Sequence, residues 1–330
     1  MWQRLSHLLC MAILATSIDA FEPTLTYASV EYLYWEAWPE TLPFATDGLA
    51  LLATQEGHIS VQPEKWDSGV RASLGRVFCV DSCAAWSLEL QYTRFKTKGS
   101  TTRFPSGGLL LYPTDLDTTF SGPGPSVARV VRITDSWGIS YQVADLSFQK
   151  EWSRGGIFGW STYGGVRAAW ISSDYHLNVP YSASTQQTNT VQRLDNSYYG
   201  LQSGVRIAWH CLPWLSLHLE GGGAILWGHT QGHFAYSDTT SAQYDNMKST
   251  FDVLQPVFDG DIGIEYGRPC CLYLGGPSYY GVRLSWDFHY WLHQSHLLKI
   301  TAFGTPARTA FEQAADLYVQ GLSVKVFLNW

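Results

Sequence analysis

Four arginines occur in the same sequence context, the tripeptide Gly-Val-Arg: Arg71, Arg167, Arg206 and Arg283. An acidic residue lies 14 to 22 positions from each of them, namely Glu89, Asp145, Glu220 and Glu265 in the same order. At such a separation two residues can face each other across a β-hairpin, where opposite charges stabilise the strand pair by about 0.2–1 kcal/mol. The chemistry that these residues predict is ion pairing between neighbouring strands.

Further charges fit the same scheme. Glu31 and Lys325 form a fifth candidate pair between the first and the last strand, and Asp287 shares the polar face of Arg283. We therefore expect one set of residues to line the interior of a barrel: Arg71, Glu89, Asp145, Arg167, Arg206, Glu220, Glu265, Arg283, Asp287 and Lys325. Because the paired charges balance each other, they predict weak ion selectivity.

Motifs for catalysis or metal binding are missing from the sequence. The ten histidines form no HExxH motif and the cysteines form no pair of CxxC motifs, so no metal site is predicted. The dipeptide Ser295-His296 is a weak candidate for hydrolase chemistry, and Gly221–Gly223 is not followed by the Gly-Lys-Ser/Thr of a phosphate-binding loop. The sequence thus predicts no enzyme, no catalytic residue and no cofactor.

The segments that carry the charges alternate between apolar and polar residues. In NSYYGLQSGVRIAWH, residues 196–210, one parity holds Tyr199, Leu201, Val205, Ile207 and Trp209. Successive side chains of a strand point to opposite faces, so one face is apolar and the other small, polar or charged. Such segments run for 10 to 16 residues, whereas strands of soluble sheets are usually about 5–6 residues long. The length favours strands that cross a membrane at a tilt.

Ten such segments are predicted, near 27–38, 66–78, 84–96, 137–152, 157–172, 196–210, 213–228, 251–267, 279–293 and 318–330. Short or medium connections (79–83, 153–156, 211–212 and 268–278) alternate with long polar ones (39–65, 97–136, 173–195, 229–250 and 294–317). The pattern predicts an all-β fold, a transmembrane antiparallel up-and-down barrel with short periplasmic turns and long external loops. Segment 97–136 has room for another hairpin, so 12 strands is the alternative to ten.

Composition and the N-terminal segment agree with a barrel in a bacterial outer membrane. Charged residues make up only 15 %, aromatic residues also 15 %, and the net charge of −7 argues against a nucleic-acid partner. Residues 1–20 have a basic start at Arg4, an apolar run and small residues, as in a signal peptide cleaved after Ser17 or after Ala20. Residues 21–330 are then one barrel domain with both termini in the periplasm.

The cysteines lie near the predicted periplasmic turns. Five remain after removal of the signal peptide: Cys79, Cys83, Cys211, Cys270 and Cys271. Disulfides persist in this oxidising compartment, and an odd number leaves at least one thiol for a bond to another copy or another envelope protein. Chance placement of small residues at turns is the alternative.

Several stretches resemble the Legionella-type pore-forming major outer-membrane protein family, which also has members in chlamydia-like bacteria. They are EYLYWEAW, WDSGVRASLG, LELQYTRFKTK, VADLSFQKEW, YGGVRAAWISSDYHL, YYGLQSGVRIAW, LSLHLEGGGAILWG, GVRLSWDFHYWLHQSHL and GLSVKVFLNW, in order along the mature chain. The resemblance implies a porin, and Trp330 at the end of the last strand resembles the signal read by the barrel assembly machinery. It also makes disulfide cross-linking more attractive by analogy.

Two functions follow from these observations. The first is a porin through which small hydrophilic solutes and ions diffuse passively, in contact with outer-membrane lipid. The second is a structural or adhesive barrel with a closed lumen, linked into the envelope by disulfides. Ten strands make a narrow barrel, so the choice depends on whether inward-facing side chains leave space.

Overall fold

The computed structural model describes twelve parts of the chain. These are residues 25–39, 43–48, 58–61, 65–78, 85–104, 110–113, 130–152, 157–180, 187–238, 243–270, 278–300 and 310–330. The predicted signal peptide lies outside the described residues. Among the residues that are described, no helix is long and apolar enough to cross a membrane.

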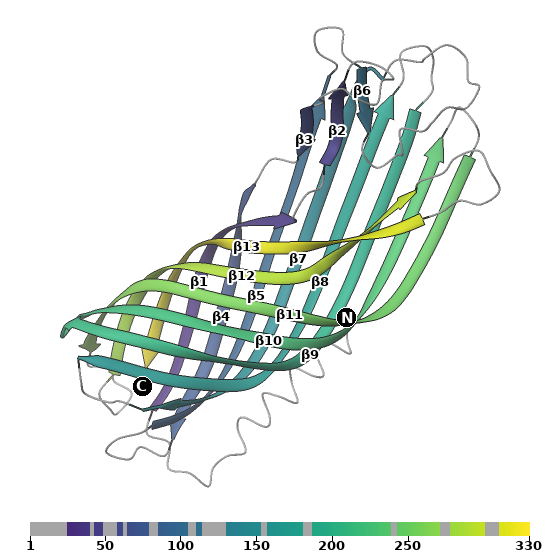
Figure 1. The fold of residues 1–330 in the computed structure, drawn as a ribbon. Helices are drawn as coiled ribbons and strands as arrows, with labels where there is room; N and C mark the ends of the chain where they lie inside the picture. The colour runs from purple at the N-terminus through teal and green to yellow at the C-terminus, as the bar shows by residue number, and fades with distance from the viewer. Residues whose placement is uncertain are drawn as a thin grey trace.

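Ten long antiparallel strands form a closed barrel (Figure 1). They are β1 (Leu25–Pro39), β4 (Trp66–Phe78), β5 (Ala85–Arg103), β7 (Ile133–Glu151), β8 (Phe158–Pro180), β9 (Gln187–Leu212), β10 (Leu215–Asp238), β11 (Gln243–Cys270), β12 (Ser278–Ile300) and β13 (Ala310–Asn329). Each strand pairs with its neighbour along this series, and β13 pairs with β1 to close it. The ten predicted strands are confirmed.

Three short strands form a separate sheet in the order β3-β2-β6. They are β2 (Pro43–Gly48), β3 (His58–Val61) and β6 (Leu110–Pro113). They lie at the end of the barrel where the long connections were predicted, which we call the loop end; the opposite end is the turn end (Figure 1). Because β6 pairs with β2 and not with a barrel strand, the alternative of 12 barrel strands is wrong. Within segment 97–136, residues 110–113 join this small sheet as β6.

The register of the strands fixes the width of the barrel. Starting at Leu25 and stepping from each residue to its partner on the next strand, the path passes Val77, Asp259 and Val319 and returns to β1 at Ala37. This stagger of about 12 residues over ten strands sets a strand tilt of roughly 40° and a backbone radius of roughly 10 Å. Large inward-facing side chains can fill such a barrel.

Alternation along the strands separates an outer from an inner face. Strand β7 alternates strictly, with its odd-numbered residues from Ile133 to Ser147 buried and the intervening residues more exposed. On β9, the predicted lipid-facing residues Leu201 and Tyr199 are 70 % and 65 % exposed, whereas Tyr198 is 2 % exposed. The predicted assignment of faces is confirmed on this strand.

Aromatic residues on the outer face form two girdles. The girdle at the turn end includes Trp160, which stacks on Trp152 at 5.4 Å, and Phe158, which stacks on Trp209 at 5.8 Å. The girdle at the loop end contains Tyr34, Trp66, Trp286, Tyr290, Tyr318, Trp227 and Tyr199. From Trp209 to Tyr199 the distance along the barrel axis is about 25 Å, given the rise of a strand and its tilt. This equals the apolar band of an outer-membrane barrel.

The two described ends of the barrel domain meet at the turn end. The backbones of Trp330 and Thr26 donate hydrogen bonds to each other at 2.8 and 2.7 Å, and the Trp330 side chain is 40 % exposed on the outer face. Trp330 is thus placed as predicted, although its role as an assembly signal stays a prediction.

One bulge changes the faces near the loop end. The register between β12 and β13 shifts between Trp291 and Ser295, and within the bulge His293 has a φ of 52°. Strict alternation would place His293 on the polar inner face together with His289, but the bulge turns it to an exposed position. Trp291, immediately before the shift, is fully buried inside the barrel.

Candidate functional site

The interior of the barrel holds a cavity of about 450 Å³ that lies toward the turn end. All ten residues that were predicted to line the interior do border it, together with Glu31, Tyr163, His218, Asp259, Asp261 and His289. These side chains come from every barrel strand, because each strand sends alternate residues inward. The cavity lies at the level of the apolar band, between the two girdles.

Three of the four predicted arginine–acid pairs are confirmed. Asp145 is the direct partner of Arg167 in the register, and their side chains approach to 2.7 Å. Arg206 contacts Glu220 at 2.7 Å, and Arg283 contacts Glu265 at 2.9 Å. Each pair joins two neighbouring strands of one hairpin, as the Gly-Val-Arg repeats indicate.

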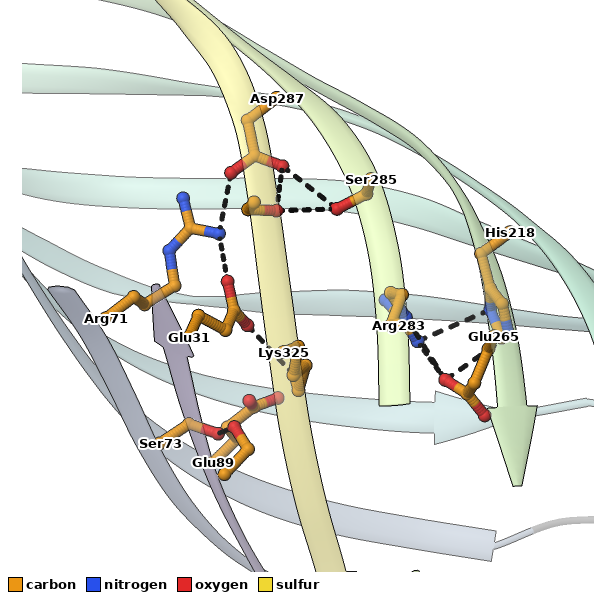
Figure 2. A network of polar contacts seen from close by, with 12 residues as sticks. Glu31, Arg71, Ser73, Glu89, His218, Glu265, Arg283, Ser285, Asp287 and Lys325 are labelled. Carbon is orange, nitrogen blue, oxygen red and sulfur yellow. Dashed lines mark hydrogen bonds and ion pairs between the residues drawn. The ribbon is translucent and has the colours of Figure 1, made fainter. Parts of the chain in front are cut away.

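The predicted pair of Arg71 with Glu89 is wrong. In the register of β4 and β5, Arg71 lies opposite Thr93 and Glu89 lies opposite Gly75, four residues away. Arg71 instead contacts Glu31 on β1 at 2.7 Å and Asp287 on β12 at 3.0 Å. Figure 2 shows the Arg71 guanidinium group between these two carboxylates. The fifth candidate pair is confirmed, since Lys325 contacts Glu31 at 3.2 Å.

Other contacts cross the lumen between strands that are not neighbours. Glu89 accepts a hydrogen bond from Arg206, three strands away in the barrel order, at 3.2 Å. Arg167 contacts Asp259 on β11 at 2.5 Å, and Asp259 in turn contacts His289 on the neighbouring strand β12 at 2.6 Å. These bridges tie separate parts of the wall together, so the charges form a network rather than separate hairpin pairs.

Gly204 makes room for the side chain of Tyr163, which borders the cavity. A Cβ atom on Gly204, in the third Gly-Val-Arg repeat, would lie 2.4 Å from the hydroxyl oxygen of Tyr163. The Tyr163 ring therefore needs glycine on the neighbouring strand. The Arg206 guanidinium group lies over this ring, 4.9 Å from its centroid, in the geometry of a cation–π contact.

Acids outnumber cations around the cavity. Five cationic residues border it, and nine acidic ones: Glu31, Glu89, Asp145, Glu151, Glu220, Asp259, Asp261, Glu265 and Asp287. The prediction of balanced charges, on which the expectation of weak ion selectivity rests, did not include the inward-facing residues Asp259 and Asp261 of β11. Asp259 and Asp261 share the polar parity of Glu265 on that strand, and this signal could have identified them.

A layer of large buried side chains lies in the lumen above the cavity, level with the loop-end girdle. Trp35 and Trp291 are 0 % exposed, and Phe95, Tyr141 and Tyr198 are at most 2 % exposed. Trp291 contacts Tyr141 with ring centroids 5.7 Å apart and Tyr198 at 6.1 Å, and Trp35 contacts Phe95 at 5.8 Å. We refer to these five residues as the aromatic layer. In the sequence Trp291 shares the polar parity of Arg283 and Asp287, but no local signal indicates that aromatic residues of five strands meet there.

The structure describes only some of the cysteines on which the disulfide prediction rests. Cys79, Cys83 and Cys271 lie outside the described residues, as does the side chain of Cys270. Cys211 is a free, exposed thiol on β9 beside the turn to β10. The described part of the chain therefore does not support an intramolecular disulfide at Cys211.

Acidic and histidine side chains form no metal site where the structure describes them. No group of three or more His, Cys, Asp or Glu residues has a geometry that could hold a metal ion within these ranges. The side chains of Ser295 and His296 lie outside the described set.

Comparison with known proteins gives one family. The family model described as Legionella pneumophila major outer membrane protein precursor matches residues 23–329. No curated protein matches the chain.

Several solved barrel structures are similar. Outer membrane protease OmpT from Escherichia coli is 8 % identical, with 94 % of this chain and 97 % of that chain covered and a TM-score of 0.45. A major outer membrane protein from Thermus thermophilus is 13 % identical, with 92 % and 99 % covered and a TM-score of 0.32. The translocator domain of autotransporter NalP from Neisseria meningitidis is 10 % identical, with 99 % and 96 % covered and a TM-score of 0.28.

Proposed function

The chain belongs to the Legionella major outer membrane protein family, and we propose that this outer-membrane barrel works as a porin of small bore for ions and small hydrophilic solutes. The charged cavity inside the apolar band is the observation that carries the proposal. Burying many ionised groups is costly unless they are paired or hydrated. A lumen lined by such groups offers polar solutes a favourable environment at the depth where the membrane excludes them.

The aromatic layer is the barrier in this proposal. It separates the cavity from the loop end, and Trp35 and Trp291 are fully buried within it. Solutes can therefore pass only when these side chains move aside, and we expect small, infrequent conductance steps. We propose no catalytic activity for the barrel, because the sequence offers no motif that would support it.

A structural barrel with a closed lumen is the second candidate. The burial of the aromatic layer supports it, since closely packed side chains leave few voids larger than a water molecule. In that case the charge network would serve to hold the barrel walls together.

Single-channel recording in planar bilayers tests the porin proposal. Wild-type protein should give discrete small steps, and Trp291→Ala should enlarge them at least twofold because it opens the aromatic layer. Trp227→Ala is the matched control, since Trp227 belongs to the outer loop-end girdle and is 50 % exposed; it should leave the steps unchanged. The surplus of acids should make the current cation-selective, as measured from the reversal potential in a salt gradient.

The remaining outcomes of this recording separate the two candidates. A silent wild type with a conducting Trp291→Ala variant would identify the closed structural barrel. Silence of both proteins, each shown to be folded by heat-modifiable migration on gels, would overturn the porin.

We further propose that cysteines near the turns link the barrel to other copies or to other envelope proteins. Cys211 is an exposed, free thiol in the described part of the chain, which leaves it accessible to another protein. Non-reducing gels of native envelopes should show high-mass species that collapse with reductant, and Cys211→Ser should remove part of them. Monomer alone in both lanes would contradict the proposal.

A further inference from the structure

Strand β5 carries three cations in a row on its outer face. In the stretch Arg94-Phe95-Lys96-Thr97-Lys98, Phe95 and Thr97 point inward and are 1 % and 4 % exposed. Arg94, Lys96 and Lys98 are exposed on the opposite face. Alternate residues of a strand lie about 6.7 Å apart, so the three positive groups follow one line on the lipid-facing side.

This line of cations begins where the apolar band ends. On the same face of β5, Trp86 belongs to the turn-end girdle and is stacked on Phe148 at 4.8 Å. With the rise and tilt of the strand, Arg94 lies about 20 Å and Lys98 about 30 Å above Trp86 along the barrel axis. The cations therefore span the level of the loop-end girdle, where lipid headgroups meet the hydrocarbon region.

The outer faces of the neighbouring strands offer these cations no acidic partner. Arg94 lies opposite Val70 on β4 and Gln142 on β7, and Lys96 lies opposite Ser140. No ion pair joins Arg94, Lys96 or Lys98 to any acid in the described ranges, whereas every cation of the interior network has one. Three like charges on one face repel each other, which is unfavourable without an anionic partner.

A fourth cationic group comes close to the same line. Lys65 donates a hydrogen bond from its Nζ atom to the backbone carbonyl of Lys98 at 2.7 Å, and its side chain is 45 % exposed. Its nearest acid is Asp67, at 3.6 Å. Below the cations, Val70 and Leu74 are 45 % and 52 % exposed on the same outer surface. A positive rim thus stands directly above an apolar wall.

We propose that Arg94, Lys96 and Lys98 bind the phosphate groups of the anionic glycolipid in the outer leaflet of the outer membrane, with the loop end of the barrel facing the cell exterior. Arginine and lysine form short, charge-assisted hydrogen bonds to phosphate oxygens. The acyl chains of the same lipid lie against the apolar wall below. The nearby hydroxyl group of Ser140 and the amide of Gln142 supply further hydrogen bonds.

Native mass spectrometry of the folded barrel in detergent tests this site with purified lipid A that carries two phosphates. The triple variant Arg94→Gln, Lys96→Gln, Lys98→Gln should bind at least tenfold more weakly than the wild type. The matched control is Arg76→Gln, Lys150→Gln, Arg268→Gln, which removes three cations from the outer face at the turn end; its affinity should stay within twofold of the wild type. Dephosphorylated lipid A should bind all three proteins equally weakly.

Three results would overturn the proposal. The first is unchanged lipid A binding by the Arg94 triple variant, and the second is an equal loss in the control, which would indicate a response to net charge only. The third is full competition by millimolar inorganic phosphate, which would identify a site for free phosphate and not for lipid. Heat-modifiable migration on gels establishes that each variant is folded before binding is measured.

Discussion

Replacing Arg167 with Met should lower the free energy of unfolding by about 3–5 kcal/mol, the range measured when one partner of a buried ion pair is removed. The Arg167 side chain is 8 % exposed and bridges Asp145 at 2.7 Å and Asp259 at 2.5 Å. Without the guanidinium group two buried carboxylates face each other across the lumen with no cation between them. Urea unfolding in lipid vesicles measures the change.

Arg193→Met is the matched control for this substitution. Arg193 contacts Asp195 at 2.9 Å, but both side chains are exposed, at 58 % and 42 %. Exposed ion pairs contribute about 0–1 kcal/mol, so the control should have a small effect. Equal losses for the two variants would show that the interior network is screened by water as fully as the outer surface.

The second large effect is expected on the lipid-facing side. Leu284 is 49 % exposed on the outer face of β12 and lies about halfway between the two girdles. Leu284→Arg should therefore destabilise the barrel by about 2–4 kcal/mol, the cost of arginine at the middle of the bilayer. The measurement is again urea unfolding in vesicles.

A second leucine on the outer face separates depth from side-chain type. Leu328 on β13 pairs with Tyr280 near the turn-end girdle, where arginine costs about 0–1 kcal/mol. If Leu328→Arg destabilised the barrel as much as Leu284→Arg, the position of the apolar band derived from the girdles would be wrong.

The barrel was predictable from the sequence because the lipid-facing parity is apolar along each crossing. The strand ends that lie toward the loops were not predictable from the sequence. Strand β9 starts at Gln187 rather than near 196, and its outer residues there include the exposed pair of Arg193 and Asp195. Above the membrane the outer face meets water, so the alternation that marks a membrane strand fades although the strand continues.

The ion pairs, too, could be predicted from the sequence only in part. Arg206 and Glu220 flank a tight connection between Leu212 and Leu215, so their register follows from their positions in the sequence. Arg71 and Glu89 flank a longer connection, whose length leaves the register of the hairpin open. Contacts across the lumen, such as Arg167 with Asp259, depend on the closure of the barrel and leave no local signal.

The seam between β1 and β13 has a consequence for the kinetics of assembly. Most neighbouring strands form hairpins that can pair as soon as both have been made, but β1 must wait for the last strand of the chain. Arg71 and Asp287, which meet at 3.0 Å, are 216 residues apart in the sequence, and contacts between distant residues form slowly because long loops must close first. The contacts of Arg71 with Asp287 and of Lys325 with Glu31 can therefore form only at barrel closure, and they contribute nothing to the barrier of any earlier step. The Glu31–Arg71 pair joins the consecutive strands β1 and β4 and can form before closure.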